Sequence, residues 1–218
     1  EPKDVANTVP KRKLVGLGAR SLVVVAPSVL LVTADVLIVG WTVGLAGASI
    51  WAVAKTIATP VALVDGVAQN YAPSRLAAVR DRQASSRVVL LGSRATGLAG
   101  LFVGMVCVLL AHLFLVPVFG EEYSEAMLPA VLLTMTAVCT GVRSIPAMEL
   151  NLRFDYRFLY AVNYGGGVLS LAAGVAAAAY FGLIGLAIAL LITRAGEATV
   201  LALRVSRTDG RQRGYVRK

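Results

Sequence analysis

The chain has 218 residues, of which 57% are hydrophobic and 15% charged, and its mean hydropathy is +0.75. A water-soluble domain of this size cannot hide so much apolar surface, so the composition excludes an ordinary soluble protein. The formal net charge is +9, but the basic residues flank apolar runs of about 20 residues, the length that crosses a membrane. We therefore expect them to face anionic lipid headgroups, and nucleic acid is not expected as a partner.

Residues 1–20 form a polar, basic segment that contains Pro2 and Pro10. The segment has no apolar run of the kind found in a signal peptide, and we expect it to lie in the cytoplasm. Since the first residue is not Met, we also expect the chain to begin inside a longer protein. The first apolar run, 21–44, is predicted as a membrane helix in which Asp35 is the single charge.

A second membrane helix is predicted over 48–73, with Lys55 and Asp65 inside it. Asp35 and Lys55 both fall roughly 10 to 14 Å below the outer surface at the rise of a helix, so an ion pair between these antiparallel helices is feasible. Such a pair either fixes helix packing or lines a cavity as a titratable, substrate-gripping pair. Asp65 lies nearer the inner end, where it can reach headgroups or Arg75, or belong to the same pathway.

Two points along the chain are predicted to interrupt a membrane helix. Pro60 lacks a backbone N–H and should kink the 48–73 helix, where Thr56 and Thr59 can satisfy the freed backbone groups. A run of three glycines, at 165–167, is expected to make a later helix easier to bend at that position. Breaks of this kind recur where transporters bend, so the candidate hinge residues are Pro60, Gly165, Gly166 and Gly167.

The polar, basic segment 74–94 contains Leu76, Val79 and Val88, and this pattern predicts an amphipathic helix lying in the membrane interface. A third membrane helix is predicted over 95–118. Its Gly100 and Gly104 have the spacing that suits close helix contact. The sole histidine, His112, is interpreted as an interfacial residue near the outer end of this helix, with a proton relay as the alternative.

Three further membrane helices are predicted, over 127–148, 158–181 and 183–204, and a hairpin at Gly182 joins the last two. Arg194 and Glu197 are three residues apart on the final helix, so they share a face and are expected to form a structural intramembrane pair. The tail, 205–218, is basic and lacks apolar periodicity. We expect it to be cytoplasmic and to lie outside regular structure.

The basic residues fall almost entirely on alternate links between these helices. All but Lys55 and Arg194 of the 21 lysines and arginines lie in residues 1–20, in the 74–94 link, in the link after the fourth helix, or in the tail, with which Arg204 at the end of the last helix is counted. Arg143 is assigned to the link after the fourth helix. Short cytoplasmic loops retain positive charge during insertion. The sequence therefore predicts an all-α, polytopic membrane bundle, with six transmembrane helices in residues 21–204 and both termini in the cytoplasm.

Few residues suggest covalent chemistry or metal binding. Cys107 and Cys139 both fall inside apolar runs, which favours buried, inert thiols over a disulfide or metal site. There is no P-loop, no nucleophile elbow and no cluster of metal ligands in the sequence. We therefore expect neither an enzyme nor a bound metal or cofactor.

Four segments carry a resemblance to a known family: ADVLIVGWTVGLAGASIWAVAK (34–55), NYAPSRLA (70–77), VPVFGEEYSEA (116–126) and YFGLIGLAIA (180–189). In this order and spacing they resemble the C-terminal half of oligosaccharide flippases of the O-antigen type, in the multidrug/oligosaccharidyl-lipid/polysaccharide exporter superfamily. Trp51 stands where many relatives have tyrosine, which leaves the subfamily open.

The resemblance implies a protein of two six-helix lobes in the inner membrane of a bacterium, of which this chain is the second lobe. It implies transfer of lipid-linked oligosaccharide from the inner to the outer leaflet by alternating access, without ATP hydrolysis. The expected partners are membrane lipid, the lipid-linked oligosaccharide and the missing N-terminal lobe. Glycan polymerase and glycosyltransferases are further candidate partners.

Three hypotheses for function follow. In the first, Asp35, Lys55 and Asp65 face a polar cavity that receives a glycan headgroup while the lipid tail stays in the bilayer. In the second, the chain belongs to a secondary transporter of the same superfamily that exports cationic drugs or other small solutes. In the third, it is a non-transporting scaffold for glycan assembly, and loss of the charges at Asp35 and Lys55 harms only folding.

Overall fold

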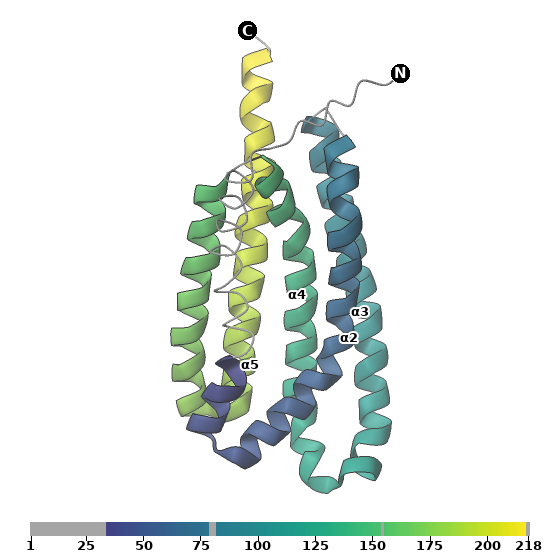
Figure 1. Ribbon diagram of the computed structural model, residues 1–218, viewed down its shortest axis with the longest axis vertical. Helices are drawn as coiled ribbons and strands as arrows, with labels where there is room; N and C mark the ends of the chain where they lie inside the picture. The colour runs from purple at the N-terminus through teal and green to yellow at the C-terminus, as the bar shows by residue number, and fades with distance from the viewer. Residues whose placement is uncertain (1–33, 79–81, 154, 217–218) are drawn as a thin grey trace, which may run out of the picture.

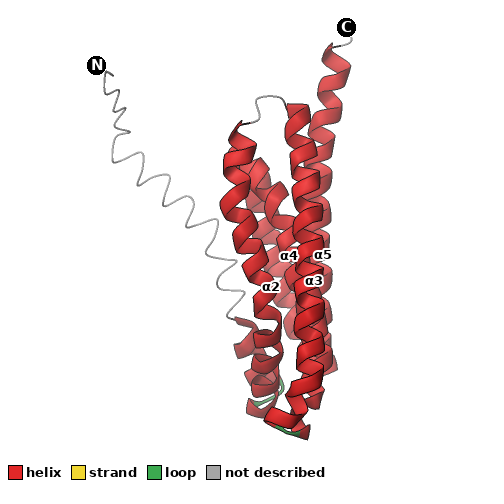
Figure 2. Cartoon of the chain, turned by 90° about the vertical axis from the view of Figure 1, so that its right-hand side faces the viewer, coloured by secondary structure: helices red, strands yellow, loops and turns green. Residues whose placement is uncertain are grey.

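The computed structural model describes residues 34–78, 82–153 and 155–216, and these residues form a bundle of long helices (Figures 1 and 2). A helical segment at 34–42 comes first. The elements that follow are α2 (Leu45–Ala78), α3 (Arg82–Phe119), the short 3-10 helix η1 (Glu121–Ala126), α4 (Met127–Leu152) and α5 (Tyr156–Val216). Four of the described helices are long and apolar enough to cross a membrane. The protein is therefore a membrane-embedded, all-helical bundle.

The longest element, α5, consists of two helical arms that meet at Gly182. The backbone there has φ 63° and ψ −145°, a conformation that is essentially restricted to glycine. Figure 1 shows the two arms side by side, the first in green and the second in yellow. The hairpin predicted between 158–181 and 183–204 is thus confirmed.

The structure describes only the last part of the first predicted membrane helix. Residues 1–33, including Pro27 and the predicted start of the helix at 21, lie outside the described residues, while 34–42 is helical. The helices expected over 48–73, 95–118 and 127–148 fall within α2, α3 and α4. The count of six spans and the orientation of the termini stay predictions.

Two expectations about the polar segments were wrong. The 74–94 segment is not an interfacial helix, because α2 continues to Ala78 and α3 begins at Arg82. Leu76 is buried inside the bundle, at 4% exposure, and burial against other helices satisfies this apolar face better than the interface does. Val79 lies outside the described residues. The tail is also helical, since α5 runs to Val216. Val205, the first residue of the tail, is buried, and no proline interrupts the helix after it.

The buried apolar side chains form two separate clusters. The Trp51 cluster comprises Val39, Trp51, Ala54, Ala58, Leu115, Ala126, Ala130, Leu133, Ala178, Leu186 and Ala187. The Leu201 cluster comprises Leu76, Val89, Ile145, Leu150, Leu159, Leu201 and Val205. In α2, α4 and both arms of α5, one end of the helix contributes to the first cluster and the other end to the second. Between the two clusters along α2, α4 and the second arm of α5 lie Asp65, Arg143, Arg194 and Glu197, which form a polar band.

Two glycines bring α3 close to its neighbours. A Cβ atom added at Gly104 would lie 2.4 Å from Thr134 Cγ2 in α4, and one added at Gly100 would lie 3.4 Å from Val138 Cγ2. The close helix contact predicted from the spacing of these two glycines is confirmed, since any larger residue at 104 would push α3 away from α4.

We predict that Gly182→Ala destabilises the bundle by about 1–3 kcal/mol, because an L-residue is strained at that backbone conformation. Gly165→Ala is the matched control, since Gly165 is helical and has open space where a Cβ would be. Thermal unfolding in detergent, followed by circular dichroism, measures both. Equal midpoints for the two variants would show that the strain at 182 is absent.

Candidate functional site

A cavity of about 420 Å³, whose largely apolar wall also carries charged side chains, opens within the bundle between residues of 34–42, α2, α4 and the second arm of α5. Three threonines and five charged side chains provide its polar lining. The charged residues are Asp35, Lys55, Asp65, Arg143 and Arg194. Four of these five were singled out from the sequence as intramembrane charges, and the structure brings all four to one place.

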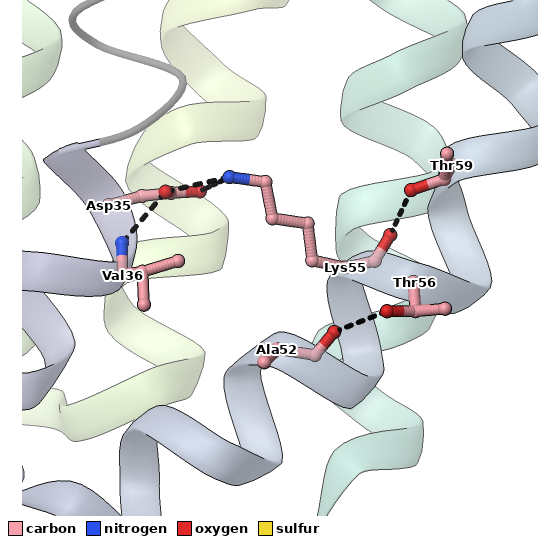
Figure 3. Close-up of polar contacts among 6 residues, drawn as sticks. All are labelled: Asp35, Val36, Ala52, Lys55, Thr56 and Thr59. Atoms are coloured by element: carbon pink, nitrogen blue, oxygen red, sulfur yellow. Dashed lines mark hydrogen bonds and ion pairs between the residues drawn. The ribbon is translucent and has the colours of Figure 1, made fainter.

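Asp35 and Lys55 form the ion pair that the sequence predicted. Lys55 Nζ lies 2.8 Å from Asp35 Oδ1 and 3.0 Å from Oδ2 (Figure 3). The backbone N–H of Val36 also donates to Asp35 Oδ1, at 2.7 Å. The Asp35 side chain is buried, at 8% exposure, whereas that of Lys55 is 33% exposed. The pair therefore neutralises a buried carboxylate and leaves the lysine accessible from the cavity.

Glu197 is shared between two arginines. Arg194 Nη1 donates a hydrogen bond to Glu197 Oε2 at 2.8 Å, which confirms the predicted pair. Arg143 Nε lies 2.9 Å from the same oxygen, so the carboxylate also ties α4 to the second arm of α5. Arg143 Nη2 donates to Asn163 Oδ1 in the first arm. One buried carboxylate thus organises three helical segments.

Arg143 was wrongly assigned to a cytoplasmic link in the sequence analysis. It lies inside α4, which runs on to Leu152, and its guanidinium faces the cavity. The signal was present, because the helix predicted over 127–148 already contained this residue. Counting it with the loop charges concealed a third intramembrane cation.

Gly166 makes room for Glu197. A Cβ atom added at Gly166 would lie 2.2 Å from Glu197 Oε1 and 2.9 Å from Cδ. Neighbouring Gly165 has open space, and α5 departs from helical geometry at Gly182 rather than at the three glycines. The packing role of Gly166 was not foreseen, and a hinge at Gly165, Gly166 and Gly167 stays a prediction.

Asp65 lines the cavity instead of reaching the headgroups or Arg75. Gln69 Nε2 donates to Asp65 Oδ2 at 2.8 Å, and Oδ1 is buried without a hydrogen-bond partner in the described part of the chain. The expected surface role was wrong because α2 extends to Ala78, which places Asp65 well before the helix end. A buried, unsatisfied oxygen is costly unless a ligand or water engages it.

Pro60 lies in α2 close to this cavity, and Figure 1 shows α2 bending partway along its length. Thr56 Oγ1 donates to the Ala52 carbonyl and Thr59 Oγ1 to the Lys55 carbonyl, each at 2.9 Å (Figure 3). Neither hydroxyl reaches the Thr56 carbonyl that Pro60 leaves free, so this expectation was wrong. A threonine in a helix bonds to the carbonyl four residues before it. The hinge role of Pro60 stays a prediction.

A second buried carboxylate, Glu149, was not singled out from the sequence. Ser85 Oγ of α3 donates to Glu149 Oε1 at 2.6 Å, and Arg153 Nε donates to the same oxygen at 2.6 Å. These contacts join α3 to the end of α4 outside the cavity.

His112 is exposed beside a separate apolar groove between α3 and α4, and Cys107 and Cys139 are free, half-buried thiols.

We predict that Gly166→Ala destabilises the protein by forcing the Glu197 carboxylate away from its two arginines, by about 3 kcal/mol for a broken buried pair. In a Glu197→Ala background the added methyl meets no carboxylate, so Gly166→Ala should cost less than about 0.5 kcal/mol. Chemical unfolding of the two single variants and the double variant measures this coupling. Additive effects would contradict the contact.

No family model, curated protein or solved structure matches this chain. The likeness to oligosaccharide flippases therefore rests on the four sequence segments quoted above.

Proposed function

We propose that this chain is one six-helix lobe of a membrane transporter that moves a lipid-linked oligosaccharide from the inner to the outer leaflet by alternating access. The observation that carries the proposal is the cavity lined by charges of both signs within an apolar bundle. Each intramembrane charge costs roughly 2.5–3.5 kcal/mol on insertion scales. A protein that keeps several of them around one cavity most often uses them on a polar substrate.

The charged and hydroxyl-bearing side chains of the lining can bind a sugar. Carboxylates accept hydrogen bonds from hydroxyl groups, lysine and arginine donate them, and threonine does both. Asp35 and Lys55, Arg143 and Arg194, and the threonines of α2 and α4 supply all three kinds of group at the cavity. The lipid tail would remain in the bilayer, beside the apolar side chains that the bundle exposes. The N-terminal lobe would close the other side of the cavity.

The arrangement of the links supports an orientation with both termini in the cytoplasm. Figure 1 shows the end of α2, the start of α3, the end of α4 and the end of α5 at one end of the bundle. Arg75, Arg153 and Arg157 lie in or near these links, and basic residues are retained on the cytoplasmic side. The resemblance to oligosaccharide flippases leads us to propose that the protein lies in the inner membrane of a bacterium.

A scaffold function is favoured by one observation, the internal pairing of the charges. Asp35 is bonded to Lys55, and Glu197 is bonded to Arg194 and paired with Arg143. Pairing of this kind also serves helix packing alone. The transport function and the scaffold function predict different results when both members of a charge pair are replaced together.

We expect Asp35→Asn and Lys55→Met each to lower both stability and glycan export in the full-length protein, because each leaves one charge unpaired in the bundle. The double variant removes both charges, so it should recover stability but not export. Export is measured at matched membrane abundance, with Arg157→Gln as a surface-charge control. Recovery of export together with stability would mean that the pair is only structural, and unchanged export in the single variants would exclude a cavity role.

Asp65→Asn separates function from folding more directly, because no described cation lies within salt-bridge distance of Asp65 and its carboxylate interacts with Arg143 only over a longer distance. We expect near-normal stability and a loss of export of about tenfold, the factor that corresponds to one substrate interaction of 1.4 kcal/mol. The measurement is again export per unit of protein in the membrane. Normal export would remove Asp65 from the pathway.

A further inference from the structure

A groove of about 850 Å³ runs along the side of the bundle, apart from the charged cavity. It lies between α3, α4 and the second arm of α5, in the part of α3 that follows Arg82. Leu90, Leu98 and Leu101 of α3 form much of its apolar wall, and Ala202 and Val205 of α5 face them across the groove. None of the residues proposed for transport lines it.

Two arginines and a buried hydroxyl provide the polar part of this groove. Arg87 and Arg94 are both exposed and both line it. They are seven residues apart, so they lie on one face of α3, about 10 Å from each other along the helix. Ser93 lines the groove too, is only 8% exposed, and its Oγ has no hydrogen-bond partner in the part of the chain described.

Within the described residues, no acidic side chain neutralises the positive charge of these two arginines. Among the described residues, no carboxylate pairs with Arg87 or Arg94. Of the acidic residues that the structure describes at this end of the bundle, Glu149 is engaged by Arg153 and Asp155 by Arg204. An anion that enters the groove therefore meets unopposed positive charge and an unsatisfied hydroxyl.

We propose that this groove binds an anionic phospholipid, with its headgroup phosphate at Arg87 and Arg94 and an acyl chain along the leucines of α3. Basic pockets between transmembrane helices are suited to anionic headgroups, and the cytoplasmic leaflet carries such lipids. The side of α3 exposes Leu91, Leu98 and Phe102, so the groove opens where hydrocarbon surrounds the bundle. The inference rests on the proposed orientation, which puts this end of α3 at the cytoplasmic leaflet, and not on transport.

The test uses native mass spectrometry of the full chain in mild detergent, with phosphatidylglycerol and phosphatidylcholine of identical acyl chains added in equal amounts. The wild type should retain phosphatidylglycerol in excess. The double variant Arg87→Gln, Arg94→Gln should lower this preference roughly 25-fold, because each arginine contributes about fivefold. Arg75→Gln with Arg157→Gln is the matched control, because it removes two exposed charges outside the groove.

A second variant tests the shape of the groove while both arginines stay in place. Ala202→Phe should reduce retention of both lipids, since the ring occupies the space beside Val205, whereas Ala161→Phe, at an exposed site on the first arm, should not. The proposal is overturned if the groove double variant keeps its preference, if the control double variant loses as much, or if Ala202→Phe has no effect. Should the double variant not fold, the comparison of Ala202→Phe with Ala161→Phe decides.

Discussion

The need to neutralise buried charge inside an apolar bundle is the constraint on which the rest of this structure depends. Glu197, at 4% side-chain exposure, cannot remain ionised in such surroundings without partners. Its two partners, Arg143 and Arg194, come from α4 and α5, so the pairing sets how these helices lie against each other. Gly166 follows from the same constraint, because a larger residue would occupy the space of the carboxylate. One interaction thus specifies helix position, helix spacing and a residue type.

The two apolar clusters place this polar band in the middle of the bundle. Trp51 and its neighbours hold one end together, and Leu201 and its neighbours hold the other. Apolar burial contributes little between helices that could equally well contact lipid, so the polar pairs add specificity that packing alone lacks. The same pairs line a cavity, so a change that weakens helix packing also changes the surface a substrate would meet. If the cavity receives a substrate as proposed, stability and transport would be coupled at Asp35 and Lys55, and less so at Asp65.

The two polar regions differ in how much of their charge the chain itself balances. In the central cavity Asp35 is paired with Lys55, and Arg194 of the lining is paired with Glu197 beside it. Most of the charge there is thus balanced by the chain, which would suit the neutral, hydroxyl-rich substrate that we propose. In the lateral groove, Arg87 and Arg94 remain unopposed by any described carboxylate, which suits an anion. A headgroup held there would lie between α3 and α5, two elements whose direct packing is sparse. Lipid in the groove would then fill space between these two elements.

The sequence by itself determined that the chain is helical and lies in a membrane, because apolar runs of spanning length can satisfy their backbone only as helices. It also indicated the hairpin at Gly182, which depends on backbone chemistry, and the pair of Arg194 with Glu197, which depends on a short spacing along the chain. For Asp35 and Lys55 it showed that a pair is feasible, because the two residues fall at similar depth on antiparallel helices. Only the tertiary structure decided that Arg143 joins Glu197, that Asp65 faces the cavity, and that 74–94 continues two helices. Each of these depends on which helices become neighbours and where they end, and residues distant in sequence carry no local signal of such contacts.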